Sequence, residues 1–133
     1  MQIRIMDVSS LTARLEERRQ RFAITGLSLL FISAGVSKFL ITGSWIGFEP
    51  GLVLETLNLS STQFTLITGA GEVLLGLWLL SARKTYYASL IASLWLLGIT
   101  VQMLRLEAWT LAIRDMGLFF YALTVLLLTR TRS

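Results

Sequence analysis

The sequence has no cysteine and no histidine among its 133 residues. Without cysteine, the chain can form no disulfide, carry out no thiol redox chemistry, and hold neither an iron–sulfur cluster nor a covalently attached haem. Without histidine, it also lacks the side chain that most often ligates haem iron and transition metals. We therefore expect no metal site and no covalently bound cofactor. Any part in electron transfer requires a diffusible carrier or a partner subunit.

Charge is also scarce. Only 15% of the residues are charged and 54% are hydrophobic, whereas a typical soluble domain is about 25% charged. This composition predicts an integral membrane protein that forms one bundle. The net charge of +4 lies in the segments that link the apolar runs. We therefore expect the basic residues to orient the chain in a lipid bilayer, and we expect no nucleic-acid partner.

Four apolar runs account for most of the chain. An α-helix needs about 20 residues to cross a hydrocarbon core, and the fourth run reaches that length only if Arg114 and Asp115 belong to it. The sequence therefore predicts an all-α, polytopic membrane four-helix bundle. Its expected spans are residues 22–42, 64–82, 86–104 and 112–129. A basic, amphipathic segment (residues 1–21) precedes the bundle, and a short tail (residues 130–133) follows it.

Basic residues mark one side of the predicted bundle. They gather in the N-terminal segment, in the link between the second and third spans, and at the C-terminus: Arg14, Arg18, Arg19, Arg21, Arg83, Lys84, Arg130 and Arg132. In a four-span chain these three segments face the same side, and the positive-inside rule places that side in the cytoplasm. We therefore expect both termini to be cytoplasmic.

Two segments outside the spans have helical signals of their own. Residues 11–21 are typical of a short helix at the cytoplasmic surface, with Ser9 or Ser10 as its cap. In the first outer loop, Pro50 is expected to open a short helix that ends near Leu57. The apolar character of this loop indicates that the short helix lies on the outer membrane surface.

Glu72 is the most informative residue, because it lies alone near the middle of the second apolar run. A carboxylate at that depth costs several kcal/mol unless it is protonated, paired or open to water. The predicted topology puts Lys38, Arg114 and Asp115 in the same outer half of the bundle. We expect Lys38 or Arg114 to neutralise Glu72, and Asp115 to pair with the second cation. Alternatively, the cations reach the outer head groups, and any pairs only fix the helix register.

Small residues predict which helix faces pack closely. In the second span, one face carries Gly69 and Gly76 on either side of Glu72, so a neighbouring backbone is expected to approach there. We expect similar faces in the first and third spans, formed by Gly26, Ser33 and Ser37 and by Ala88, Ser89, Ala92 and Ser93.

Three short motifs follow one another along the chain. They are a G-x-x-K motif at residues 35–38, a G-x-x-E-x-x-x-G-L motif at residues 69–77, and an R-D-x-G-L motif at residues 114–118. In this order the sequence resembles the DoxX-like family of four-span bacterial and archaeal membrane proteins, and the resemblance covers residues 22–129. It implies a prokaryotic inner membrane and a link to membrane redox systems, such as a thiosulfate:quinone oxidoreductase and a superoxide-detoxifying assembly.

The resemblance matches Lys38, Glu72, Arg114 and Asp115 to recurring polar positions of the family, without fixing their roles. We expect these four residues to form a candidate binding cluster for a quinone or a lipid. Glu72 or Asp115 could then exchange a proton with a quinol.

Three functions remain open. The first is an accessory subunit of a larger membrane complex, such as a quinone-linked one. The second is a quinone- or lipid-binding protein that uses the polar cluster. The third is a small proton-coupled transporter, which ranks last because four-span multidrug exporters keep their intramembrane glutamate in the first span. No autonomous catalytic centre is visible, so enzymatic activity stays open. The expected partners are the lipid bilayer, other membrane subunits and further copies of the chain.

Overall fold

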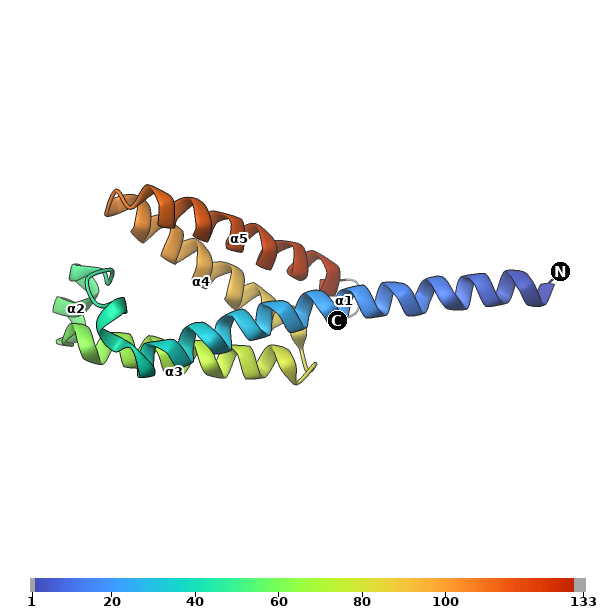
Figure 1. Cartoon of the computed structure of the whole chain (residues 1–133), viewed down its shortest axis with the longest axis horizontal. Coiled ribbons are helices and arrows are strands. Elements are labelled where there is room, and N and C mark those ends of the chain that lie inside the picture. Colours follow the sequence, from blue (N-terminus) through green and yellow to red (C-terminus); the bar gives the residue numbers. More distant parts are fainter. Residues whose placement is uncertain (1, 131–133) are drawn as a thin grey trace.

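The computed structural model describes the backbone of residues 2–130 and the side chains of residues 8–130. The described part is helical and contains no strand. Its elements in chain order are α1 (Gln2–Leu40), the 3-10 helix η1 (Thr42–Trp45), α2 (Gly51–Leu57), α3 (Ser61–Leu80), α4 (Thr85–Arg105) and α5 (Trp109–Arg130) (Figure 1). Of the predicted C-terminal tail, Arg132 lies outside the described residues.

Four helices, α1, α3, α4 and α5, are long and apolar enough to cross a membrane. This finding confirms the predicted all-α bundle with four candidate spans. Large apolar side chains are exposed on every long helix, Leu29, Leu74, Leu94 and Leu127 among them. Such exposure is expected where lipid tails, not water, surround the bundle.

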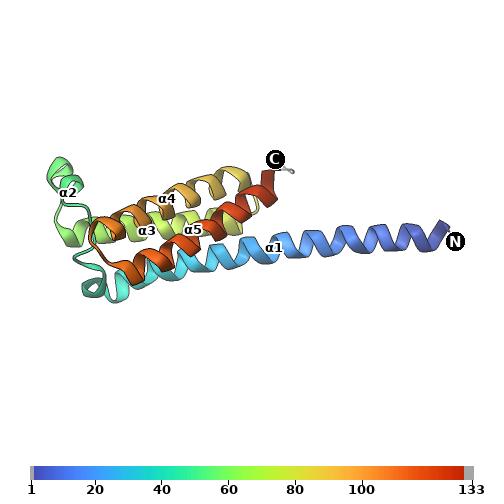
Figure 2. The same cartoon turned by 90° about the horizontal axis from the view of Figure 1, so that it is seen from above.

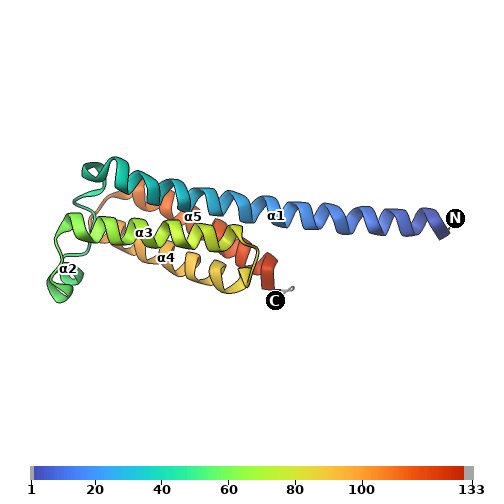
Figure 3. The ribbon, with the colours of Figure 1, turned by 90° about the horizontal axis from the view of Figure 1, so that it is seen from below.

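Helix α1 differs from the prediction at its N-terminal end. The prediction of a separate helix at residues 11–21, capped by Ser9 or Ser10, is wrong. Helix α1 runs without a break through 39 residues. That length corresponds to about 58 Å at 1.5 Å per residue. The arginines and glutamates of this segment favour helix as strongly as leucine does, so nothing there ends the helix. The N-terminal half of α1 projects beyond the other helices (Figures 2 and 3).

The predicted short helix in the loop before α3 is present as α2, with Pro50 as its N-cap residue. Helix α3 then begins with the capping box that the spacing of Ser60 and Gln63 predicts. The Ser60 hydroxyl accepts a hydrogen bond from the Gln63 N–H at 3.2 Å, and the Gln63 side chain accepts one from the Ser60 N–H at 3.0 Å.

We call this end of the bundle, with η1, α2 and the turn between α4 and α5, the α2 end.

The helices form two antiparallel pairs, α1 with α3 and α4 with α5. Glycines on both α1 and α3 allow the first pair to pack closely. A Cβ atom at Gly35 would lie 2.5 Å from the Gly69 carbonyl oxygen, and one at Gly76 would lie 2.8 Å from the Ser28 carbonyl oxygen. The Ser28 hydroxyl also donates a 2.6 Å hydrogen bond to the Gly76 carbonyl. The predicted close face of the second span is therefore confirmed.

The predicted small-residue face of the first span is wrong for Ser33 and Ser37, and only Gly26 lies close to a neighbouring helix, since an added Cβ atom there would lie 2.5 Å from the hydroxyl oxygen of Tyr121 on α5. Gly26 and Ser33 are exposed, and Ser37 is only half-buried. The small residues of α1 that meet α3 include Ser28 and Gly35. Small residues occur on more than one side of this helix, so their spacing alone does not single out the packed side.

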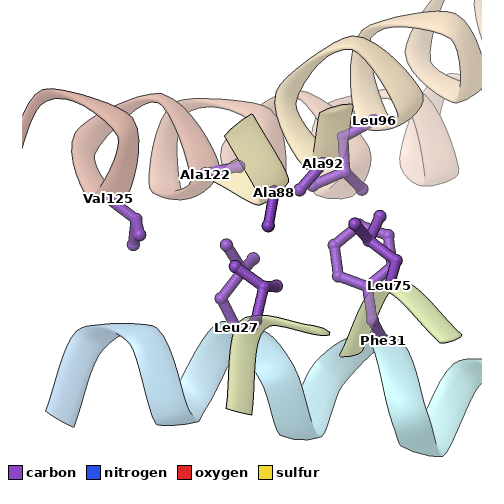
Figure 4. Packing of buried hydrophobic residues seen from close by; sticks show 9 residues of the cluster. Leu27, Phe31, Leu75, Ala88, Ala92, Leu96, Ala122 and Val125 are labelled. Carbon is purple, nitrogen blue, oxygen red and sulfur yellow. The ribbon is translucent and has the colours of Figure 1, made fainter. Parts of the chain in front are cut away.

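The two pairs meet at the end opposite to the α2 end. There the Tyr121 hydroxyl donates to the Ala23 carbonyl at 2.6 Å, and the Gln20 side chain donates to the Leu128 carbonyl at 2.9 Å. The buried apolar core lies between the pairs (Figure 4) and consists of Leu27, Phe31, Leu75, Leu79, Ala88, Ala92, Leu96, Ala122 and Val125. Alanines in α4 and α5 let the pairs approach, and the pairs diverge toward the α2 end (Figure 1).

The close crossing of α1 and α3 predicts a steep cost for one added methyl group. Gly35→Ala should lower the free energy of unfolding by about 1–3 kcal/mol, because its Cβ meets backbone atoms that have no room to move. Gly98→Ala is the matched control, since nothing lies within 4 Å of its added Cβ. It should be neutral or stabilising by up to ~1 kcal/mol. Unfolding of the purified protein in mixed micelles with increasing dodecyl sulfate measures both; equal effects of the two changes would contradict the close crossing.

Candidate functional site

A buried ion pair joins α1 and α3. The ammonium group of Lys38 donates to a carboxylate oxygen of Glu72, and it lies 3.4 Å from the hydroxyl oxygen of Thr68. Trp95 on α4 supplies a further donor to Glu72. The side chains of Lys38 and Glu72 are only 12% and 4% exposed. Of the two predicted partners for Glu72, the structure therefore selects Lys38, and Lys38 points into the bundle instead of toward the head groups.

A second ion pair lies within α5. The guanidinium of Arg114 donates to Oδ1 of Asp115 from Nε at 3.1 Å and from Nη2 at 3.0 Å. The Asp115 side chain is buried, whereas that of Arg114 is 54% exposed. The charge of Arg114 therefore stays at the bundle surface while the carboxylate of Asp115 faces inward. The predicted pairing of Asp115 with the second cation is confirmed.

A cavity of about 570 Å³ opens between the two helix pairs at the α2 end. Its walls are mostly apolar and include Trp45, Phe48, Phe64, Trp95, Met103 and Leu111. Gly98 also lines it, and no atom lies within 4 Å of the place where a side chain would begin. The volume is in the range of small-molecule sites in proteins, which is about 300–1,000 Å³.

A second cavity of about 200 Å³ adjoins the first, with Lys38, Trp45, Ile99, Arg114 and Asp115 lining both. The smaller cavity is also lined by Glu72. The structure thus brings all four predicted cluster residues around one small cavity, at the side of a larger apolar one. Gln102 lines the larger cavity as well, whereas Arg105 is exposed.

Trp45 is a site residue that the sequence does not reveal. It belongs to η1, which contacts both α1 and α3. The ammonium of Lys38 lies 5.2 Å from the centre of its ring, which is within the range of a cation–π interaction. The only signal in the sequence is that residues 43–63 are too apolar for a loop in water. That signal does not tell an inward tryptophan from one at the membrane surface.

Glu49, in the segment between η1 and α2, also lines the larger cavity. Partial burial alone would raise the pKa of Glu49. Hydrogen bonds from the Ser61 side chain and from the backbone of its own loop outweigh that effect and hold the pKa below its ordinary value. One of these donors is the N–H of Gly47 at 2.9 Å. Glu49 is therefore ionised at neutral pH and already satisfied by its loop.

Within the described residues, no group of three or more acidic, histidine or cysteine side chains could hold a metal ion. The site offers two ion pairs, several aromatic rings and apolar walls. Comparisons of the chain with models of protein families, with curated proteins and with solved structures found no match.

The ion pair between Lys38 and Glu72 predicts a strong coupling between the two positions. Lys38→Met should destabilise the protein by about 3–5 kcal/mol, because it leaves a buried carboxylate without a partner. Adding Glu72→Gln should restore part of that loss, since a neutral amide needs no cation. A double-mutant cycle of unfolding free energies measures the coupling, and simple additivity of the two changes would refute the pair.

Proposed function

We propose that the protein holds an amphipathic, membrane-soluble molecule, a quinone or a lipid, in the cavity at the α2 end. The observation that carries this proposal is the cavity of about 570 Å³, whose lining is mostly apolar and includes a few charged groups. Ligand sites commonly combine apolar walls with a few polar groups that orient the bound molecule. The helices that enclose the cavity carry exposed leucines and isoleucines on their outer surfaces, so the bilayer that would supply such a molecule surrounds them.

We further propose that the chain is a multi-pass protein of a prokaryotic inner membrane with both termini in the cytoplasm. The N-terminal half of α1, the turn after α3 and the end of α5 lie at the same end of the bundle and carry the basic residues. The positive-inside rule favours the cytoplasm for that end. The α2 end, with the cavity, then faces outward, and α2 lies in the outer head-group region.

Membership of the DoxX-like family is part of the same proposal. The three motifs that carry the resemblance supply Lys38, Glu72, Arg114 and Asp115, and all four residues line the smaller cavity. A shared binding site would explain why these motifs occur together in one chain.

A second candidate function is that of an accessory subunit in a larger membrane complex. The projecting half of α1 carries Val8, Leu11 and Leu15, all of them exposed. Their spacing places them on one face of the helix. In the proposed topology this face extends into the cytoplasm, where an apolar stripe favours contact with another protein.

Filling the cavity tests ligand binding. Gly98→Leu places a side chain into the larger cavity and should reduce the amount of co-purified quinone or lipid by at least roughly tenfold, since each 1.4 kcal/mol of lost affinity is a factor of ten. Gly117→Leu is the matched control, because Gly117 also has nothing within 4 Å but does not line either cavity. Solvent extraction and mass spectrometry of protein purified in mild detergent give the ratio. Equal retention by both variants would exclude the cavity as the binding site.

The accessory-subunit proposal has its own test. Replacing Val8, Leu11 and Leu15 together by serine should release any subunit that co-purifies stoichiometrically from native membranes. A control with Glu17→Gln changes the opposite face of the helix and should retain the subunit. Quantitative mass spectrometry of gently extracted complexes gives the stoichiometry. If both variants retain the same proteins, the stripe is not the contact surface.

A further inference from the structure

Two buried polar atoms at this site have no hydrogen-bond partner among the described residues. They are Oδ2 of Asp115 and the indole Nε1 of Trp45. The third such atom, Ser89 Oγ, belongs to a residue that lines neither cavity. Buried polar groups are almost always hydrogen-bonded, and an unmade bond typically costs about 1–3 kcal/mol. Two unpaired atoms on residues that line the same cavities therefore require an explanation.

The two atoms are complementary in kind. Oδ2 of Asp115 can accept a hydrogen bond, and the N–H of Trp45 can only donate one. They also come from different halves of the bundle, Trp45 from η1 beside the α1–α3 pair and Asp115 from α5. Both residues line both cavities. A molecule that satisfies them must carry a donor and an acceptor in its head group.

The charged residues that line the cavities indicate whether that head group is charged or neutral. Lys38 is paired with Glu72, and Arg114 is paired with Asp115 through Oδ1. Glu49 is held by its own loop. Each charged residue that lines the cavities thus already has a partner, so a charged head group would enter without a free counter-charge. Burying an uncompensated charge is far more costly than burying a neutral polar group.

We propose that the cavity binds an uncharged amphipathic molecule whose head group carries a hydroxyl; this inference rests on the proposed function. The hydroxyl donates to Oδ2 of Asp115, and an oxygen of the same head group accepts from the N–H of Trp45. The apolar part of the molecule lies against the aromatic wall of the larger cavity. A diacylglycerol and a quinol share this chemistry.

Four probes test the head group, with the protein in nanodiscs and bound molecules counted by native mass spectrometry. They are dioleoylglycerol, its O-methyl ether, dioleoyl phosphatidic acid and a reduced decyl-benzoquinol. At least one hydroxyl probe should bind roughly tenfold or more tightly than the methyl ether, since a hydrogen bond to a charged group gives that discrimination. The affinity for that hydroxyl probe should also exceed the affinity for phosphatidic acid by a similar factor. Whichever hydroxyl probe binds more tightly, dioleoylglycerol or the benzoquinol, shows whether the natural ligand is a lipid or a quinol.

Two variants assign the recognition to its residues. Asp115→Asn keeps one oxygen for Arg114 and replaces the free acceptor by an amide donor. The ratio of the affinities for the hydroxyl probe and its methyl ether should therefore fall to about one. Trp45→Phe removes the donor and should weaken both probes by a similar factor, roughly three- to tenfold, with the preference unchanged. A preference measured within one variant does not depend on how much of the sample is folded.

The outcomes separate this inference from the proposed function. If the ether or phosphatidic acid binds as tightly as the hydroxyl probes, and Gly98→Leu still blocks that binding, the hydroxyl head group is wrong while the cavity remains a binding site. An Asp115→Asn protein that keeps the full preference for hydroxyl also overturns the inference. If no probe binds at all, the inference fails, and the proposed function depends on the co-purification results for Gly98→Leu and Gly117→Leu.

Discussion

A carboxylate within an apolar helix must be neutralised, and the way in which Lys38 neutralises Glu72 determines much of this structure. The two side chains meet only if α1 and α3 approach closely. Gly35 lies one turn before Lys38, and Gly69 lies one turn before Glu72, so each glycine is on the same helix face as the charge. The backbones touch at these glycines, and a Cβ atom at Gly69 would lie 3.0 Å from Cβ of Lys38. The glycines and the ion pair thus form one interaction, and the G-x-x-K and G-x-x-E motifs have a common physical reason.

The same interaction explains why the site lies between the helix pairs. Lys38 and Glu72 tie α1 to α3, while Arg114 and Asp115 are neighbours within α5. Neither ion pair by itself joins the α1–α3 pair to the α4–α5 pair, and near the ion pairs only the hydrogen bond from Trp95 to Glu72 is described between them. The hydrogen bonds of Tyr121 and Gln20 that cross between α1 and α5 lie at the opposite end. The α2 end is therefore where the pairs can separate and leave a cavity.

The sequence predicted the parts of this fold that depend on the cost of burying charge. The four candidate spans and the pairing of Glu72 follow from that cost, and so does the gathering of Lys38, Arg114 and Asp115 at one end. The inner face of α3 was also predictable, because Gly69 and Gly76 flank the acid. The predictions that failed concern alternatives that differ little in free energy. In α1, Ser28 and Ser33 are chemically alike, and only the packed structure shows that Ser28 is buried. The basic residues from which the sequence predicts a membrane boundary do not mark a helix boundary, so the sequence does not predict the length of α1.

Side-chain size along α4 accounts for the shape of the space between the pairs. Its first turns present Ala88, Ser89, Ala92 and Ser93, all buried, and small residues allow helices to approach closely. Its later turns present Trp95, Ile99 and Met103, which hold the pairs apart. Large side chains on one helix cannot fill a widening gap alone, because close packing needs partners on the facing helices. Across the gap, α1 carries Lys38, and beside α4 in the same pair α5 carries Asp115. The charged groups of both are engaged in ion pairs and do not fill the gap with apolar atoms. A gradient of side-chain size and a cluster of paired charges at one end of the bundle thus account for a mostly apolar cavity with a few paired charges in its lining.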